Sequence, residues 1–77
     1  MRFANIEAIK AHQFTGNHFS DHEAFNAIEV FVSDGSNTIA DRAEAIRTMC
    51  HDGMGLGRDE DIADHKLVTT YLELAGM

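Results

Sequence analysis

Glycine is spaced along this chain so that it divides the sequence into four segments, each of a length that suits one short helix. The six glycines are Gly16, Gly35, Gly53, Gly55, Gly57 and Gly76, and the chain contains no proline. Glycine often follows the last turn of a helix, because it adopts the left-handed backbone conformation that ends many helices. We therefore predict an all-α fold, with residues 1–77 forming one small domain that is a bundle of three to four short helices.

The second segment has the strongest helix signal. Ser20 and Glu23 have the spacing of a capping box, in which two side chains bind free backbone N–H groups at the start of a helix. Phe19 precedes that cap, in the position of a hydrophobic staple. The apolar residues that follow share one arc of about 160° on a helix: Ala24, Phe25, Ala27, Ile28, Phe31 and Val32.

The alternative for this segment is a strand over residues 28–32 that turns at Asp34 and Gly35, since Asp-Gly is a frequent hairpin turn. That reading would give an α+β fold with a small hairpin near residues 28–40. The capping pattern and the length of the apolar arc favour the helix.

The first and third segments have weaker helix patterns. Asn5 is the expected cap of a short first helix over roughly residues 6–14, with a short strand as the alternative. The third helix is expected to begin at Asn37 or Thr38 and to end near Gly53. Its apolar stripe is Ile39, Ala43, Ile46 and Cys50, with Met49 at the edge.

The fourth segment opens in a run of acidic residues, which suits a helix start because carboxylates oppose the positive end of the helix dipole. Asp61 or Asp64 is the expected cap. Either placement keeps Asp64 off the apolar face, where an unpaired buried carboxylate would be costly. That face comprises Leu67, Val68, Tyr71, Leu72, Leu74 and Ala75, and it ends at Gly76.

The charge of the chain constrains its partners. Thirteen acidic residues against six basic ones give a formal net charge of −7. Direct binding to nucleic acid needs the opposite sign, so we expect none. An acidic surface favours a basic protein surface as partner, and the nucleic-acid-binding surface of a larger protein is one candidate. The alternative is that the charge only keeps a small protein soluble.

The cysteine count and the hydropathy pattern indicate the compartment. Cys50 is the single cysteine, so the chain forms no disulfide within itself. No run of about 18 apolar residues suggests a membrane span or a signal core. We therefore expect a cytoplasmic protein that does not bind membranes.

The segment from Asp52 to Asp64 is the most distinctive part of the sequence, because it holds five acidic residues and a single base, Arg58. A capped helix start accounts for only two or three of the acids, and the spacing does not match a calcium loop. The glycine-rich loop over residues 53–57 carries two apolar residues, Met54 and Leu56. We predict a partner-binding surface formed by Asp52, Met54, Leu56, Asp59, Glu60, Asp61 and Asp64.

The histidines raise the question of a metal site. His18 and His22 have a spacing that binds zinc from one helix face, but a helix capped at Ser20 leaves His18 outside it. The adjacent pair His51 and Asp52 occurs in metal-dependent phosphohydrolases, which need further ligands on several long helices. We therefore predict no metal and no cofactor.

Cys50 is the one candidate nucleophile. Its neighbour His51 would point about 100° away from it on a helix, so it is poorly placed as a base. Cys50 also lies on the apolar stripe, which predicts a buried, inert thiol and no catalytic residue.

These patterns favour a small, acidic, non-enzymatic protein-binding module. Its size and charge suit a phage- or plasmid-type inhibitor of the anti-defence (anti-CRISPR-like) kind, which would occupy a basic nucleic-acid-binding surface of a larger protein. One alternative is a small metal-dependent hydrolase or metal-binding protein that uses His51, Asp52 and other histidines. The other alternative is a structural homodimer.

Overall fold

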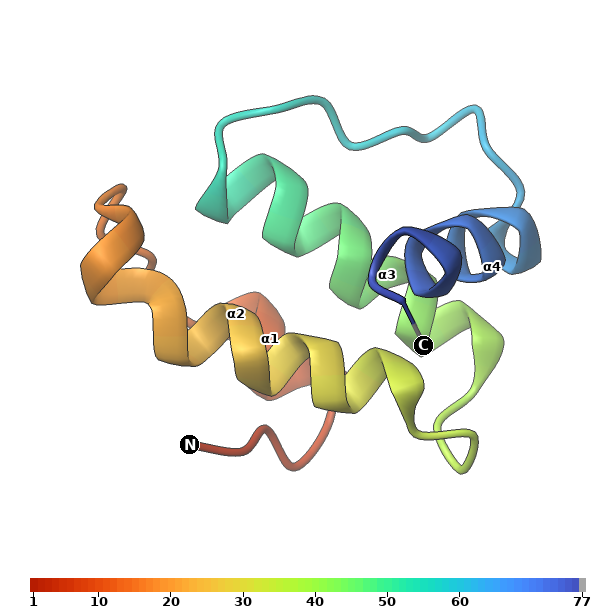
Figure 1. Cartoon of the computed structure of the whole chain (residues 1–77), viewed down its shortest axis with the longest axis horizontal. Helices are drawn as coiled ribbons and strands as arrows, with labels where there is room; N and C mark the ends of the chain where they lie inside the picture. Colours follow the sequence, from red (N-terminus) through yellow and green to blue (C-terminus); the bar gives the residue numbers. More distant parts are fainter. Residues whose placement is uncertain (77) are drawn as a thin grey trace.

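The computed structural model describes residues 1–76, which form four α-helices, a π-helical turn and no strand (Figure 1). In chain order these are α1 (Ile6–Ala11), α2 (His18–Ser33), α3 (Ile39–Thr48), the π-helical turn η1 (Met49–Gly53) and α4 (Asp64–Leu74). The predicted all-α bundle is confirmed. The alternative hairpin near residues 28–40 is wrong, because residues 28–33 continue the helix α2.

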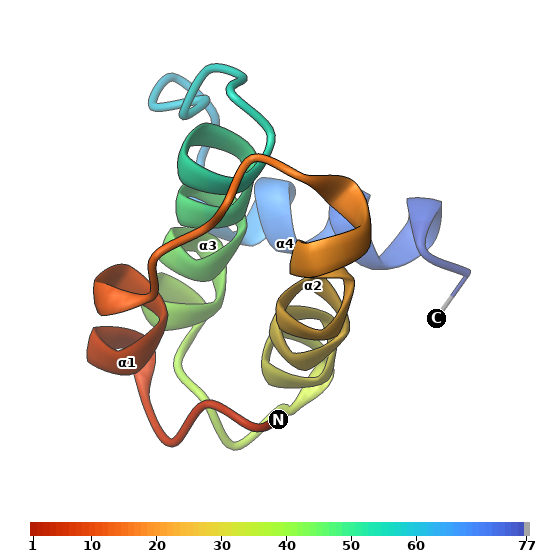
Figure 2. The ribbon, with the colours of Figure 1, turned by 90° about the vertical axis from the view of Figure 1, so that its left-hand side faces the viewer.

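Helix α3 lies at the centre of the bundle, where α1, α2 and α4 all pack against it. Figure 2 shows α1 and α2 on either side of α3, with α4 crossing behind them. The side chains buried where these helices meet include Ile9, Ile28, Val32, Ala43, Ile46 and Val68. None of the helices within residues 1–76 has both the length and the apolar character needed to cross a membrane.

The predicted apolar arc of α2 and two of the predicted caps are confirmed. All six residues of the arc are buried except Phe25, which is half-buried. Asn5 caps α1 by accepting a 3.0 Å hydrogen bond from the N–H of Ala8. Thr38 caps α3 in the same way, accepting from the N–H of Asp41 at 3.1 Å.

Helix α2 begins earlier than the sequence suggested. Its cap is Asn17, whose Oδ1 accepts hydrogen bonds from the N–H of Phe19 at 2.9 Å and of Ser20 at 3.4 Å. The predicted Ser20 capping box is wrong, because Ser20 lies inside the first turn. The predicted staple is also wrong, since Phe19 is 91% exposed.

A buried carboxylate fixes the turn that precedes α2. Asp21 is 2% exposed, and its Oδ1 accepts hydrogen bonds from the N–H and the hydroxyl of Thr15, both at 2.9 Å. Its Oδ2 accepts from the N–H of Gly16 at 3.1 Å. Gly16 has φ 80°, which glycine adopts without strain. This turn, rather than Ser20, sets the position at which α2 begins.

The predicted apolar stripe of α3 is only partly right. Ile39 is 40% exposed, because the first turn of α3 extends beyond the packed region. The helix buries more of its circumference than one stripe, because three helices cover it. Its buried residues are Ala43, Ala45, Ile46, Arg47 and Thr48.

The third helix ends at Gly53, as predicted, but its last residues form the π-helical turn η1. Gly53 lies against the rings of Phe14 and Phe25, which stack with their centroids 5.7 Å apart. A Cβ at Gly53 would lie 2.7 Å from Cε1 of Phe25, closer than carbon atoms approach. The absence of a side chain therefore lets η1 pack on these two rings.

Helix α4 starts differently from the prediction. Its cap residue is Ala63, which has no side-chain hydrogen bond to offer. Asp61 and Asp64 are therefore not caps, although Asp64 does lie in the first turn.

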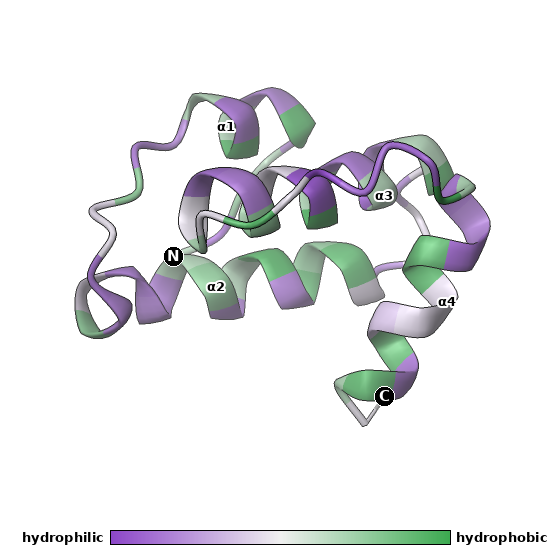
Figure 3. Cartoon of the chain, turned by 90° about the horizontal axis from the view of Figure 1, so that it is seen from above, coloured by the Kyte–Doolittle hydropathy of each residue, from purple (hydrophilic) through white to green (hydrophobic). Residues whose placement is uncertain are grey.

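The apolar face of α4 extends further than the core. Leu67 and Val68 are buried and Tyr71 is half-buried, but Leu74 is 84% exposed. Figure 3 shows the hydrophobic last turn of α4 projecting away from the other helices. The C-terminal part of this face is thus available for contact outside the bundle.

Candidate partner-binding surface

The predicted surface lies on the long connection between η1 and α4. In Figure 1 this connection, residues 54–63, passes over α3 from one end of the helix to the other. Its start folds back on η1, because the N–H of Leu56 donates to the carbonyl of Cys50 at 2.9 Å.

Arg58 ties the middle of this connection to α3. Its terminal Nη2 lies 2.7 Å from both carboxylate oxygens of Glu44, and its Nε donates to Glu60 at 2.6 Å. The hydrogen bond from Arg58 is the main cause that lowers the pKa of Glu60. The bonds from Glu44 and Glu60 raise the pKa of Arg58 in turn. Arg58 and Glu60 are therefore charged together over the physiological range.

Arg47 holds the end of the connection from inside the protein. The residue is 8% exposed, and its Nη2 donates to the carbonyl of Ile62 at 3.0 Å and to Asp64 at 2.8 Å. Its Nε is buried and has no hydrogen-bond partner within residues 1–76. The two arginines together set the path of residues 58–64 along α3.

These pairs divide the acidic residues of the predicted surface into two groups. Glu60 and Asp64 are bound by arginines, and Asp52 lies 2.8 Å from Nδ1 of the adjacent His51. Asp59 and Asp61 are exposed and form no ion pair with any residue in 1–76. Asp59 and Asp61 are thus the two carboxylates of this surface that no side chain within residues 1–76 binds in an ion pair.

An open apolar groove of about 230 Å³ adjoins Asp59. Its walls come from α3 and η1, from the 54–63 connection and from α4. The lining residues are Ile46, Cys50, Asp59, Ile62, Leu67, Thr70, Tyr71 and Leu74. Of the predicted surface only Asp59 reaches the groove, while Met54 and Leu56 are exposed elsewhere on the connection.

This groove was not among the features predicted from the sequence. Tyr71 and Leu74 follow the helical period of Leu67, so the pattern assigned them to the core. One sequence feature did point to exposed apolar surface here. The apolar face of α4 runs to Leu74, the last residue of that helix. The other wall, at Ile62, depends on the path of the connection, which local sequence does not encode.

Besides Asp59, two titratable groups line the groove, Cys50 and Tyr71. Burial raises the pKa of the Cys50 thiol, and the nearby Asp59 carboxylate raises it further. Burial likewise raises the pKa of Tyr71 to about 12, with the Glu29 carboxylate as the next cause. Cys50 is half-buried rather than fully buried, and its raised pKa keeps it protonated at neutral pH.

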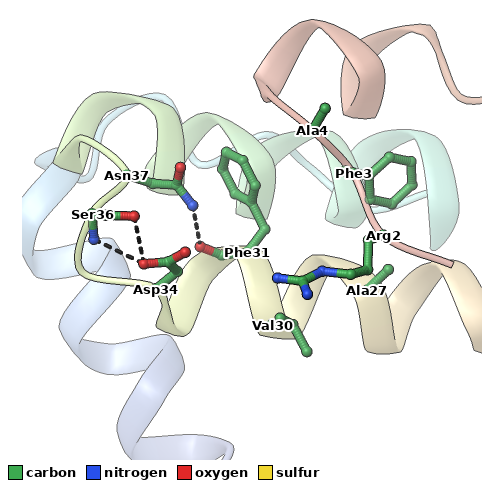
Figure 4. A pocket seen from close by; sticks show the side chains of 9 residues that line it. All are labelled: Arg2, Phe3, Ala4, Ala27, Val30, Phe31, Asp34, Ser36 and Asn37. Carbon is green, nitrogen blue, oxygen red and sulfur yellow. Dashed lines mark hydrogen bonds between the residues drawn. The ribbon is translucent and has the colours of Figure 1, made fainter.

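A second hollow, of about 390 Å³, lies where the N-terminal segment crosses α2 (Figure 4). Three of its polar residues, Asp34, Ser36 and Asn37, are bonded within the protein. Asp34 accepts hydrogen bonds from the N–H and the hydroxyl of Ser36, and the amide of Asn37 donates to the carbonyl of Phe31 (Figure 4). These three residues therefore stabilise the turn between α2 and α3.

The histidines are dispersed. His18 and His22 both lie in α2, so the expectation that His18 precedes the helix is wrong. The ring of His18 packs near Phe25, and His12 lies edge-on between Phe3 and Phe14. Within residues 1–76 no three His, Cys, Asp or Glu side chains gather closely enough to hold a metal ion.

Comparison with known protein families gives no match, and neither curated proteins nor solved structures show significant similarity to this chain.

Proposed function

We propose that this chain is a small non-enzymatic protein-binding module that docks on a basic surface of a larger protein. The observation that carries the proposal is the pair Asp59 and Asp61, exposed and without an ion pair within residues 1–76, on a connection that also exposes Met54 and Leu56. Unpaired charge beside exposed apolar side chains suits an interface, where charge steers association and apolar contact retains the partner.

We propose further that the basic surface of the partner is one that binds nucleic acid. A surface that binds nucleic acid is rich in Lys and Arg, which neutralise phosphates. A chain of net charge −7 suits such a surface electrostatically and would compete with nucleic acid for it. The module therefore acts as an inhibitor of the phage- or plasmid-encoded, anti-defence kind.

The test is affinity capture from an extract of the source cell, performed at low and at raised salt. We expect a basic protein to be retained at low salt and released at high salt, because exposed charges are screened. The purified chain should then displace labelled nucleic acid from the captured protein. A captured protein that binds nucleic acid equally well with the chain present would contradict the inhibitor role.

A matched pair of variants separates a local surface from overall charge. Asp59→Asn/Asp61→Asn and Glu7→Gln/Asp41→Asn each remove two negative charges that form no ion pair within residues 1–76, and the second pair lies on α1 and α3. Asn is preferred at position 59 because Asp59 has φ 54°, a conformation that Asn also tolerates. Capture should weaken only in the first variant. Equal weakening would leave overall charge as the cause, and no weakening in either would exclude Asp59 and Asp61 from the interface.

A further inference from the structure

The groove between α3, the 54–63 connection and α4 has the size and lining of a receptor for side chains. Its volume of about 230 Å³ is below the range of roughly 300–1,000 Å³ that is usual for small-molecule sites. Protein interfaces commonly use such small apolar pockets to receive one or two anchoring side chains. The walls that Ile46, Leu67 and Tyr71 provide are suited to aliphatic or aromatic groups.

The groove continues onto exposed apolar surface. Leu74 is 84% exposed at its edge, and Ile62 on the opposite wall is 37% exposed. Both side chains belong to segments whose positions are fixed, since Arg47 holds the carbonyl of Ile62 and Leu67 anchors α4 in the core. A partner that covers the groove would therefore also bury the side chains of Leu74 and Ile62.

The charges around the groove select the occupant. Asp59 lies on its wall, and the Glu29 carboxylate of α2 is a further cause, after burial, that raises the pKa of Tyr71 in the groove. The nearest arginines, Arg47 and Arg58, are neutralised by their carboxylate partners. A second copy of this chain would bring the same carboxylates and a net charge of −7 against them, so a self-association site is disfavoured.

We propose that this groove receives the apolar side chains of a basic amphipathic helix of the partner, whose Lys or Arg residues meet Asp59 on its wall. An amphipathic helix presents apolar residues every three or four positions and, on a basic helix, Lys or Arg beside them, which matches an apolar groove with the carboxylate of Asp59 on its wall. The inference rests on the proposed function and adds the site and the chemistry of docking.

The test uses two synthetic peptides of identical Leu and Lys composition, one in amphipathic helical order and one scrambled. Cys50 lines the groove, so its alkylation by iodoacetamide reports occupancy. The ordered peptide should bind more tightly than the scrambled one and slow the alkylation of Cys50. Leu74→Ala should weaken that binding about tenfold, as truncation of an interface anchor does. Phe19→Ala, which removes a side chain 91% exposed on α2, should leave binding unchanged.

Three outcomes would overturn the proposal. The groove is not the site if both peptides bind alike and leave Cys50 alkylation unchanged, or if neither peptide binds. It is a self-association site if sedimentation of the chain alone shows a dimer that Leu74→Ala abolishes. With either peptide result, the proposed function still stands if capture of the partner depends on Asp59 and Asp61. Failure of the groove proposal can therefore be told apart from failure of the proposed function. Because Leu74 is exposed, its variant should unfold at an unchanged denaturant concentration.

Discussion

Arg47 in α3 and Asp64 in α4 form an ion pair of 2.8 Å in which the arginine side chain is 9% exposed and the carboxylate 42% exposed. The pair joins two helices across 17 positions of sequence. It also fixes one end of the 54–63 connection, because Arg47 binds the carbonyl of Ile62 as well. The groove and the exposed carboxylates of the connection both depend on this buried arginine.

Asp64→Asn should lower the stability of the fold. It leaves the guanidinium of Arg47 buried with only the carbonyl of Ile62 and a neutral amide as partners. Removing one member of a buried pair costs about 3–5 kcal/mol, and the partial exposure of Asp64 reduces this to about 1–3 kcal/mol. The measurement is the midpoint of urea unfolding. Asp61→Asn, an exposed change in the same segment, is the control and should leave the midpoint in place.

Asn17→Ala should cost about 1 kcal/mol of stability, because the N–H groups of Phe19 and Ser20 lose their side-chain acceptor. Ser20→Ala should have almost no effect, since the hydroxyl of Ser20 does not cap α2. The unfolding midpoints of the two variants show which of the two residues caps α2. A larger loss of stability in Ser20→Ala than in Asn17→Ala would mean that Ser20 is the cap of α2.

Gly53→Ala should be destabilising by about 1–3 kcal/mol, the usual cost of overpacking. The added methyl group would meet Phe25 at 2.7 Å and Phe14 at 3.2 Å. Gly57→Ala is the matched control, because nothing lies within 4 Å of the added carbon and the position has no positive φ. Thermal unfolding of both variants measures the difference. Phe25→Leu in the Gly53→Ala background should recover part of the loss, and a failure to do so would argue against this contact.

The carboxyl group of Asp21 should make stability fall in acid. Hydrogen bonds, first from the backbone of Thr15, lower its pKa below the ordinary value of 3.8. A group whose pKa is lowered by folding stabilises the protein above its unfolded pKa, and this contribution is lost as pH falls through the folded pKa. Wild type should therefore lose stability over the acid interval that begins at the ordinary value of 3.8 and ends below the lowered pKa of Asp21. Asp21→Asn should be less stable at pH 7 and change less over this interval. Identical pH profiles for the two proteins would contradict the role of Asp21.

The apolar period of α2 and the caps at Asn5 and Thr38 were predictable from the sequence, because periodicity and capping are local properties. The start of α2 was not, since Asn17 and Ser20 are both good caps. The choice between them follows from the burial of Asp21 under the preceding turn.

The candidate surface was predictable only as a stretch of sequence. Its exposed charge depends on which carboxylates the arginines bind, and those pairs span 14 positions for Arg58 with Glu44 and 17 for Arg47 with Asp64. The groove requires the same long-range contacts, so no local pattern indicates it.

Cys50 should react slowly with iodoacetamide in the native protein and faster once the chain is unfolded. Only the thiolate reacts, and burial, followed by the carboxylate of Asp59, raises the pKa of this thiol above its ordinary value of 9.0. Asp59→Asn removes the second cause, so it should lower the pKa and speed native labelling at neutral pH. Asp41→Asn, on the first turn of α3, is the control and should leave the rate unchanged. The measurement is the labelling rate as a function of pH for the three proteins. Equal rates in the native and unfolded chain would place Cys50 outside the groove, and an unchanged rate in Asp59→Asn would place the carboxylate away from the thiol.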